Sequence, residues 1–262
     1  MEAALAASRT GAEAVLVTPE PDRIAMMPCN PAIGGVAKGC LVREIDALGG
    51  AMAMAADAAA VQFRMLNLGK GPAVWGPRVQ ADSDIYPGIM TETLNRSRVR
   101  IVPGMVTALE GGPARFTGVV LEDRTVVPGD AFVIATGTYL GGILYRGEER
   151  WPGGRAGGLT STGLNRFISG MFHVERFKTG TSPRVVTSSL DLKALEAQES
   201  HDAGFRFSIE SRRPIRSAMK CYLARTNSDT TAAVRENLHR SPLHRRAIEG
   251  RGPRYCPSFE DK

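Results

Sequence analysis

Cysteine is scarce in this chain of 262 residues, which carries only Cys29, Cys40, Cys221 and Cys256. No two of them have the C-x-x-C spacing. Four cysteines in this pattern are too few for a disulfide scaffold and do not match a zinc site. We therefore expect free thiols, a reducing cytoplasmic environment and no bound metal.

Long apolar runs are also absent. None approaches the roughly 18 residues that a membrane helix needs. Residues 1–5 lack the basic region of a secretory signal, so no membrane partner is expected. Acidic residues are outnumbered, with 27 carboxylates against 33 lysines and arginines and a net charge of +6. This excess favours acidic partners such as nucleic acid or phosphorylated cofactors.

The spacing of apolar residues predicts an α/β protein. Helices are expected at 2–9, 41–48, 51–60 and 82–96, and strands at 14–18, 61–66, 99–102, 116–121, 125–127 and 131–138. A helix followed by a parallel-type strand normally belongs to a βαβ unit whose first strand comes earlier. No strand precedes the first predicted helix in this sequence. The glycine-rich stretch 152–158 indicates an internal seam.

The most unusual stretch is segment 29–35, which reads Cys-Asn-Pro-Ala-Ile-Gly-Gly. Pro31 restricts its own backbone and that of the preceding residue. Gly34 and Gly35 allow a sharp bend and a close approach of the backbone to a ligand. The helix predicted to follow would offer free N–H groups to an anion, so we expect both glycines to bind a cofactor or another anionic group.

Two thiols, Cys29 and Cys256, lie in unusual sequence and are candidate nucleophiles. A free thiol has a pKa near ~8.5 and needs a helix N-terminus or a nearby cation to become reactive. Lys38, Arg43 and Arg254 are the candidate cations. From the residues alone, catalysis and burial as a small apolar side chain both stay open.

Three other loops suit anions or cofactors. Residues 178–184 combine Lys178 and Arg184 with hydroxyl groups and a glycine, which is good chemistry for phosphate or carboxylate. Lys70, followed by Gly-Pro, is a weaker signal of the same kind. Gly137 ends the predicted strand 131–138 in a tight turn that is typical of flavoproteins with two dinucleotide-binding domains.

Six segments together resemble one family: 29–35, 70–73, 80–82, 153–157, 178–181 and 252–258. In order and spacing they are similar to the GidA (MnmG) family of tRNA uridine 5-carboxymethylaminomethyl modification enzymes. The resemblance implies a Rossmann-like FAD domain of the glutathione-reductase type that carries an inserted α+β domain. Residues 1–175 would form part of the FAD domain, and residues 176–262 part of the inserted domain on the NAD and substrate side.

The same resemblance implies cofactors, partners and roles. FAD would be the cofactor, with NADH and methylenetetrahydrofolate as co-substrates, and the wobble uridine of tRNA would be modified together with an MnmE-type GTPase. Cys29 and Cys256 match the catalytic cysteines, and Val106 and Ser161 match FAD contacts. The NAD-associated stretch would begin with Gly252, Pro253, Arg254 and Tyr255. The full-length protein would be a cytoplasmic homodimer.

The sequence departs from the family pattern in the glycine-rich turn and at two single positions. The Gly-x-Gly-x-x-Gly turn expected before the first helix is absent, so the FAD pyrophosphate would lack its main cradle. Cys40 and Ser83 stand where the family usually has His and Arg. We expect a fragment of roughly two-fifths of an enzyme that binds FAD poorly and is inactive alone.

Three alternatives remain. One is a flavoprotein like the folate-dependent tRNA uracil-5-methyltransferase. Another is a non-catalytic remnant that binds tRNA or a partner. The third is a thiol–disulfide protein, which would need Cys29 and Cys256 close together.

Overall fold

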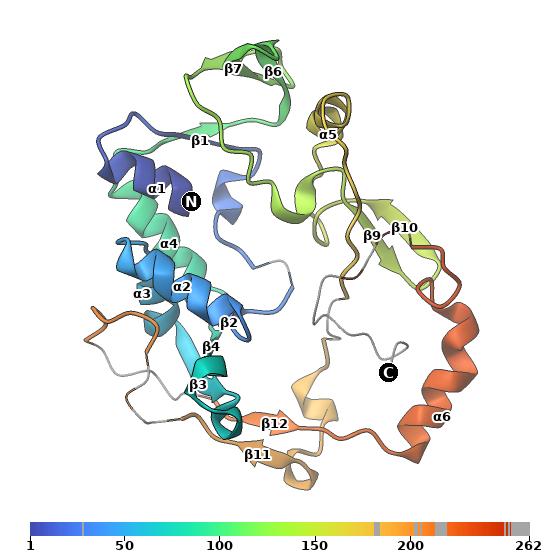
Figure 1. Cartoon of the computed structure of the whole chain (residues 1–262). Coiled ribbons are helices and arrows are strands. Elements are labelled where there is room, and N and C mark those ends of the chain that lie inside the picture. Colours follow the sequence, from blue (N-terminus) through green and yellow to red (C-terminus); the bar gives the residue numbers. More distant parts are fainter. Residues whose placement is uncertain are drawn as a thin grey trace. The chain divides into compact units, whose positions relative to one another are not determined.

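The computed structural model describes residues 1–27, 29–180, 184–201, 204, 206–212, 219–248, 250 and 252 (Figure 1). It contains two compact units, each assembled from separate stretches of chain. Unit 1 comprises residues 1–16, 20–102 and 185–224, and unit 2 comprises 17–19, 103–184 and the chain from 225 onward. Parallel and antiparallel pairing occur together with helices, which confirms the α/β class. The predicted division at residue 175 into two ligand-binding domains stays a prediction.

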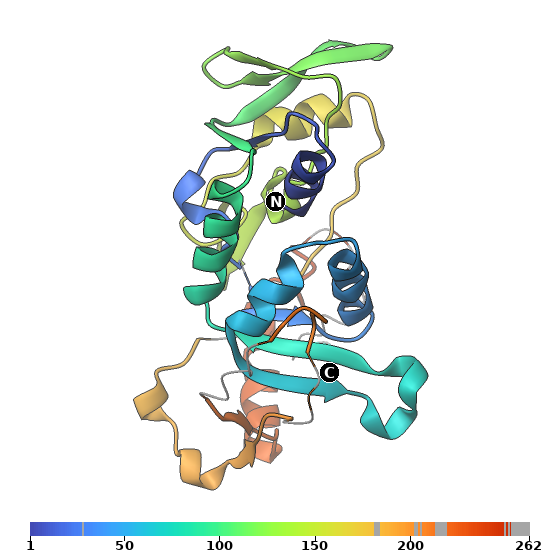
Figure 2. The ribbon, with the colours of Figure 1, turned by 90° about the vertical axis from the view of Figure 1, so that its left-hand side faces the viewer.

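Unit 1 contains a three-stranded antiparallel sheet with helices beside it. Figure 2 shows the hairpin of β3 and β4, in cyan and teal, below the blue helices α2 and α3. The strand order is β2-β4-β3. The elements of this part are α1 (Glu2–Arg9), β2 (Ala32–Gly34), α2 (Lys38–Ala47), α3 (Met52–Ala58), β3 (Ala60–Leu66), β4 (Gly76–Ala81) and α4 (Ile85–Asn95).

All four predicted helices of this part are confirmed. The last begins three residues later than expected because the Asp82 side chain accepts backbone hydrogen bonds from Asp84 (2.9 Å) and Ile85 (3.0 Å). Such a bond holds the preceding residues in a turn, and the helix starts after it.

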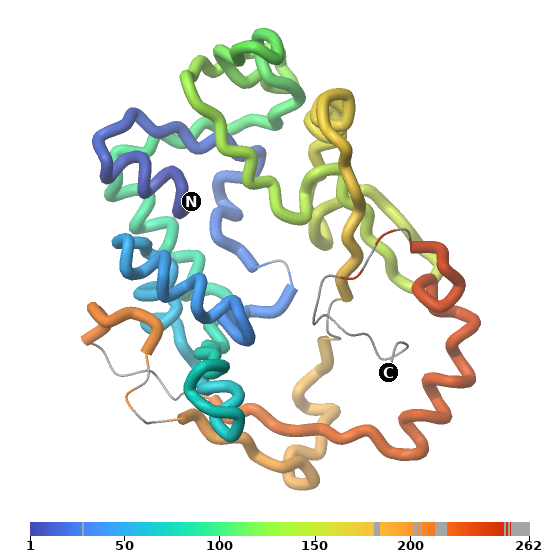
Figure 3. Tube along the Cα trace, in the orientation of Figure 1, coloured from blue at the N-terminus to red at the C-terminus, as the bar shows by residue number. Residues whose placement is uncertain are grey.

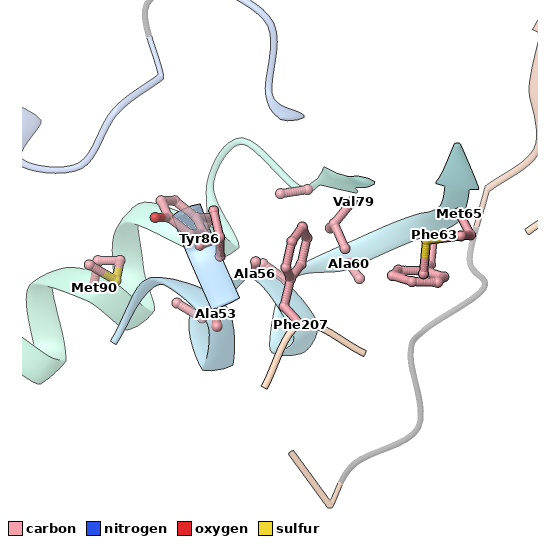
Figure 4. Packing of buried hydrophobic residues seen from close by; sticks show 13 residues of the cluster. Ala53, Ala56, Ala60, Phe63, Met65, Val79, Tyr86, Met90 and Phe207 are labelled. Carbon is pink, nitrogen blue, oxygen red and sulfur yellow. The ribbon is translucent and has the colours of Figure 1, made fainter. Parts of the chain in front are cut away.

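Thirteen buried residues form the main core of unit 1 (Figure 4). The alanines of α3 bring this helix close to the sheet, where the rings of Phe63 and Phe207 are almost fully buried. Burial, with a smaller effect of the Glu2 carboxylate, raises the pKa of Tyr86 to about 12. The members are Val42, Ala53, Ala55, Ala56, Ala59, Ala60, Phe63, Met65, Val79, Ala81, Tyr86, Met90 and Phe207.

A second cluster of five buried residues joins α1 to α4: Leu5, Ala14, Ile24, Leu94 and Val99. Next to it, β1 (Val15–Thr18) pairs with β5 (Arg100–Pro103). The backbone N–H groups of Arg100 and Gly104 donate to the carbonyl oxygens of Ala14 and Thr18. Both partners advance together along the chain, so the pairing is parallel. Unit 1 also holds the antiparallel pair β11 (Glu196–Gln198) and β12 (Cys221–Leu223).

Unit 2 is built mainly from hairpins. The antiparallel sheet β6-β7-β8 contains the predicted 116–127 hairpin, and the rings of Phe116 and Phe167 meet edge to face with centroids 6.2 Å apart. The elements are β6 (Val106–Gly112), β7 (Arg115–Leu121), β8 (Val126–Pro128), β9 (Ile143–Arg146), β10 (Glu149–Pro152), α5 (Thr162–Ser169) and α6 (Ser228–Asn237).

The described residues of both units also form short 3₁₀ turns: η1 (Pro21–Arg23), η2 (Leu68–Lys70), η3 (Pro72–Val74), η4 (Gly137–Tyr139), η5 (Thr187–Ser189), η6 (Leu192–Ala194) and η7 (Leu238–Arg240).

The predicted buried strand 131–138 is wrong. Residues 131–136 have no regular structure, and Val133 is 77% exposed. An apolar run becomes a strand only where a neighbouring strand takes its backbone hydrogen bonds, and none of the described strands pairs with it. The expected seam at 152–158 is not a boundary between the units, because Gly153 and Gly154 are buried inside unit 2. No described helix has the length and apolar character needed to cross a membrane.

Candidate functional site

Segment 29–35 is held along strand β4 within unit 1. Its middle forms β2, whose residues Ala32, Ile33 and Gly34 lie opposite Gln80, Val79 and Arg78. Hydrogen bonds continue the pairing on both sides, from Ala81 N to Pro31 O (2.7 Å) and from Gly35 N to Pro77 O (2.9 Å). The segment is therefore a short edge strand, where the sequence alone predicts a loop.

The two glycines of this segment meet different surroundings. A Cβ at Gly34 would lie 2.3 Å from Pro77 O and 2.4 Å from Cζ of Phe207, so only glycine fits there. A Cβ at Gly35 would meet no atom within 4 Å. Both have a positive φ, +86° and +101°. The room beside Gly34 is thus filled by the protein itself, whereas Gly35 leaves space that a ligand could use.

The turn into α2 uses part of its own hydrogen-bonding capacity. Gly39 N donates to Gly35 O (2.9 Å) and Lys38 N to Val36 O (2.8 Å), which removes two of the N–H groups expected to face an anion. Ala37 lies between them with φ of +64°, in the left-handed region that disfavours a residue with a Cβ. The surrounding hydrogen bonds hold this strained turn in place.

Three cysteines lie among the described residues, and no disulfide joins any two of them. Cys29 and Cys221 are half-buried, and Cys40 is exposed on α2. Cys256 lies outside the described residues, so its pairing with Cys29 stays a prediction. Of the three candidate cations, Lys38 is exposed at the start of α2, Arg43 donates to the backbone oxygen of Arg206, and Arg254 is not described.

Arg64 and Arg78, which the sequence reasoning missed, form a basic row on the sheet. They are opposite each other on β3 and β4 and share the face away from Phe63 and Val79. Neither makes an ion pair with a described carboxylate. Arg64 donates to Glu199 O (3.0 Å) and Arg78 to Oε1 of Gln80 (3.2 Å). Each arginine is next to a buried apolar residue in its strand, Arg64 beside Phe63 and Arg78 beside Val79. This alternation of polar and apolar residues is the sequence signal that could have identified the row.

Lys70, the predicted anion ligand of this part, lies in η2 at the tip of the same β3–β4 hairpin. Its side chain is exposed. The tip is held by Asn67, whose Nδ2 donates to Val74 O (3.2 Å), and by Trp75, whose Nε1 donates to Leu68 O (3.3 Å). The hairpin therefore presents Lys70 from a supported turn.

Residues 198–201 run along the outer edge of β3. His201 N donates to Phe63 O (2.8 Å), and Met65 N donates to Nδ1 of His201 (3.1 Å). Burial, and secondly the charge of Arg64, lower the pKa of His201. A neutral imidazole suits this position, because Nδ1 must accept a hydrogen bond there.

In unit 2, Val106 and Ser161 are in direct contact. Ser161 is 6% exposed, and its Oγ donates to the carbonyl oxygen of Val106 (2.8 Å). Its backbone N donates to Tyr139 O (2.8 Å) in η4, the turn that Gly137 opens. The fold thus links Val106 and Ser161, two predicted cofactor residues, by a hydrogen bond. Ser161 is also hydrogen-bonded to the turn that begins with Gly137, a third predicted cofactor residue.

These unit 2 residues fit a cofactor through their backbone. Gly137 has φ of +55°, is exposed, and would meet no atom within 4 Å if it carried a Cβ. The Ser161 hydroxyl already donates within the protein, so it positions the Val106 strand and keeps only acceptor capacity for a ligand. A close backbone approach at Gly137 is the feature that favours a bound group here.

Lys178, on the predicted anion loop, lies near the start of the predicted NAD stretch. A Cβ at Gly252 would be 3.7 Å from Cε of Lys178, and one at Gly250 would be 2.5 Å from Arg176 O. Arg184 is exposed. Pro253, Arg254 and Tyr255 lie outside the described residues, and the proposed NAD contacts there stay a prediction.

A wide groove of about 510 Å³ opens elsewhere in unit 1, between η1 and α4. Asp22, Asp84 and Glu92 line it, together with Ser83. Three carboxylates repel an anionic cofactor or a nucleic-acid backbone, so this groove is not the site that the sequence predicts.

Similarity to known proteins extends over the entire chain. The family model described as "Glucose inhibited division protein A" matches residues 1–262. A relative from Geobacter sulfurreducens, named tRNA uridine 5-carboxymethylaminomethyl modification enzyme MnmG, is 45% identical over 100% of this chain and 42% of its own length. The protein of that name from Thermus thermophilus is 44% identical, with 44% of its length covered.

Solved structures give the same result. A crystal structure of Aquifex aeolicus GidA superposes with a TM-score of 0.89 at 40% identity, over 99% of this chain and 45% of that one. A second crystal form gives a TM-score of 0.87 at 38% identity. The chain therefore spans less than half the length of the proteins that it matches.

Proposed function

Because the chain belongs to the Glucose inhibited division protein A family, we propose that it is part of an FAD-dependent enzyme that modifies C5 of the wobble uridine in tRNA. The group added would be the (carboxymethyl)aminomethyl group. The observation that carries this proposal is the match along all 262 residues to proteins named for that modification. Segment 29–35, held on β4, supplies the reactive thiol.

Roles follow for the residues of each unit. Cys29 is the catalytic thiol of unit 1, supported by its partial exposure and by the hydrogen bonds that hold segment 29–35. Cys256 is the second thiol. Val106, Gly137 and Ser161 contact FAD, which is supported by the open backbone at Gly137. Gly34 and Gly35 are the proposed cofactor residues of unit 1, and the open space beside Gly35 supports that role for it.

NADH and methylenetetrahydrofolate are the proposed co-substrates. Gly252, Pro253, Arg254 and Tyr255 bind NADH, and the approach of Lys178 to Gly252 supports an anion contact in that stretch. FAD supplies electron transfer when bound. The chain's own residues bind and orient the reactants and hold the thiols.

Basic side chains provide the proposed contacts with tRNA. The predicted ligands Lys70, Lys178 and Arg184 are three of them. The basic row adds Arg64 and Arg78, two residues whose guanidinium groups lack an ionic partner among the described residues. Guanidinium groups bind phosphate in a bidentate manner, and such contacts weaken with salt. An MnmE-type GTPase, a homodimeric full-length protein and a cytoplasmic location complete the proposal.

The chain alone is proposed to bind FAD weakly and to lack turnover. It covers 42% of the Geobacter sulfurreducens relative, so more than half of that protein's length has no counterpart in it. Residues 1–175 would contribute to the FAD domain and residues 176–262 to the inserted domain. A purified chain with a stoichiometric flavin absorbance band would contradict this part.

A chimera tests the function itself. The 262 residues replace the matching part of the Geobacter sulfurreducens relative, and the chimera is expressed in bacteria that lack their own family member. We expect mass spectrometry of tRNA nucleosides to show the modified wobble uridine. Cys29→Ser should lower its amount by at least about a hundredfold, because a hydroxyl replaces the reactive thiol.

Cys40→Ser is the matched control, since Cys40 is exposed and has no proposed role. It should leave the modified nucleoside unchanged. A folded chimera that forms no wobble modification would overturn the proposal, as would full activity of the Cys29→Ser chimera. Formation of 5-methyluridine instead would assign the chain to the methyltransferase alternative.

A further inference from the structure

Four consecutive residues, 206–209, are tied down on helices α2 and α3 of unit 1; we call them the strap. Figure 3 shows this stretch in orange beside the blue helix α2. The backbone N–H groups of Phe207 and Ser208 donate to the two oxygens of Asp57, each at 3.0 Å. Asp57 is 4% exposed, so the strap occupies both oxygens of a buried carboxylate.

Helix α2 holds the two ends of the strap. Arg43 donates to the backbone oxygen of Arg206, and the backbone N of Ile209 donates to Oδ2 of Asp46 (3.3 Å). The strap thus has a hydrogen bond at each of its four residues, from helices that follow segment 29–35 in the chain.

The side chain of Phe207 passes from the strap into the core beneath segment 29–35. Phe207 is 1% exposed and lies among Ala56, Ala60 and Val79 (Figure 4). Its Cζ stands 2.4 Å from the position that a Cβ of Gly34 would take. The glycine at position 34 is therefore the counterpart of this ring, and the two are in tight contact.

We propose that Phe207, fixed by Asp57, is a positioning residue that holds segment 29–35 and thereby Cys29. Strand β2 is only three residues long and, among the described strands, pairs with β4 alone, so the ring supplies its second support. Cys29 is three residues before β2, and loosening the strand exposes the thiol. The proposal rests on the proposed function only for the catalytic role of Cys29.

The test measures the reactivity of the Cys29 thiol in the full chain. In a background with Cys40, Cys221 and Cys256 replaced by Ser, the rate of reaction with a neutral maleimide is followed. Phe207→Ala should raise the rate at least about fivefold, because local opening then costs less free energy. Phe207→Leu, which retains apolar bulk, should restore most of the slow rate.

Two matched variants separate positioning from general effects. Ile209→Ala changes an 83% exposed residue of the same strap, and Leu94→Ala opens the other core cluster, which contains no residue of segment 29–35. Both should leave the rate as in the background. Asp57→Asn removes one acceptor for the strap and should raise the rate less than Phe207→Ala.

The result that overturns the proposal is an unchanged rate in a folded Phe207→Ala chain, or an equal rise in Leu94→Ala. If Phe207→Ala does not fold by circular dichroism, Asp57→Asn decides, and its rate of reaction with maleimide must then exceed that of Ile209→Ala. The reaction needs neither flavin nor tRNA. An inactive chimera would therefore refute the proposed function and leave this inference standing.

Discussion

The two units of this protein are stabilised in different ways. Unit 1 buries a cluster of thirteen residues and a second of five. Among the described residues of unit 2, only Leu121, Val127 and Leu164 are buried hydrophobics. Free energy from apolar burial is therefore concentrated in unit 1. Segment 29–35 lies on that well-packed body, which suits a thiol that must be held in place.

Unit 2 relies on hydrogen bonds around its predicted cofactor residues. Ser161 joins Val106 and Tyr139, while apolar side chains such as Val133 and Phe177 are 77% and 74% exposed. Each net hydrogen bond contributes about 1 kcal/mol, less than a buried aromatic ring. The proposed thiol segment is therefore prearranged by apolar packing, whereas the proposed flavin contacts of unit 2 are held by a few polar links.

The largest expected effect comes from emptying the core of unit 1. Phe63→Ala removes a fully buried ring and should lower the free energy of unfolding by about 3–5 kcal/mol. Phe116→Ala is the counterpart in unit 2, where the ring is half-buried against Phe167, and should cost about 1–2 kcal/mol. Urea unfolding followed by circular dichroism compares them. Equal losses would break the contrast between the units.

Carboxylates that accept backbone hydrogen bonds give a second comparison. Asp57→Asn places an amide donor opposite a strap N–H group in the interior and should cost about 1–3 kcal/mol. Asp123 in the exposed turn after β7 accepts from Thr125 N (2.9 Å), a bond that lowers its pKa. Asp123→Asn should cost clearly less. A larger loss for Asp123→Asn in thermal unfolding would refute the role given to Asp57.

Ser161→Ala sharpens the description of unit 2. The Val106 carbonyl loses a buried donor, so the free energy of unfolding should fall by about 1 kcal/mol. Ser169→Ala is the control, because its Oγ donates to Asn165 O (2.8 Å) at the exposed end of α5, the helix that begins directly after Ser161. Thermal unfolding of the two variants measures the difference, and no difference would show that the Ser161 link adds no stability.

The smallest effect is a dependence on pH at the edge of β3. The pKa of His201 is lowered in the folded state, so the unfolded chain binds more protons as the pH falls. The contribution of neutral His201 to the free energy of unfolding is fully present above the usual histidine pKa of about 6.5. It is lost as the pH falls from there through the lowered pKa of the folded state. His201→Gln should remove this part of the slope of unfolding free energy against pH. An identical slope in the variant would exclude His201 as its source.

Much of the fold follows from local pattern, and the failures have physical causes. The four helices were predictable because apolar residues recur at helical spacing over short, continuous stretches. Strand 131–138 was not, because strand formation depends on a partner elsewhere in the chain. The basic row was within reach, since Arg64 and Arg78 alternate with Phe63 and Val79.

The site itself was only partly readable. Segment 29–35 stands out by its residue types, and its edge-strand form depends on pairing with β4, which local sequence does not encode. Gly34 suggests a ligand at close range, yet the group that approaches it is Phe207, far along the chain. A glycine in the sequence indicates that another group lies close to the backbone, but it does not indicate whether that group is a ligand or a side chain of the protein.

Amide hydrogen exchange read by mass spectrometry tests the central contrast most directly. We expect slow exchange for β3, for β4 and for Gly35, whose N–H donates to Pro77 O. We expect rapid exchange throughout residues 131–136, which have no regular structure. Protection of 131–136 equal to that of β4, or rapid exchange at Gly35, would contradict it.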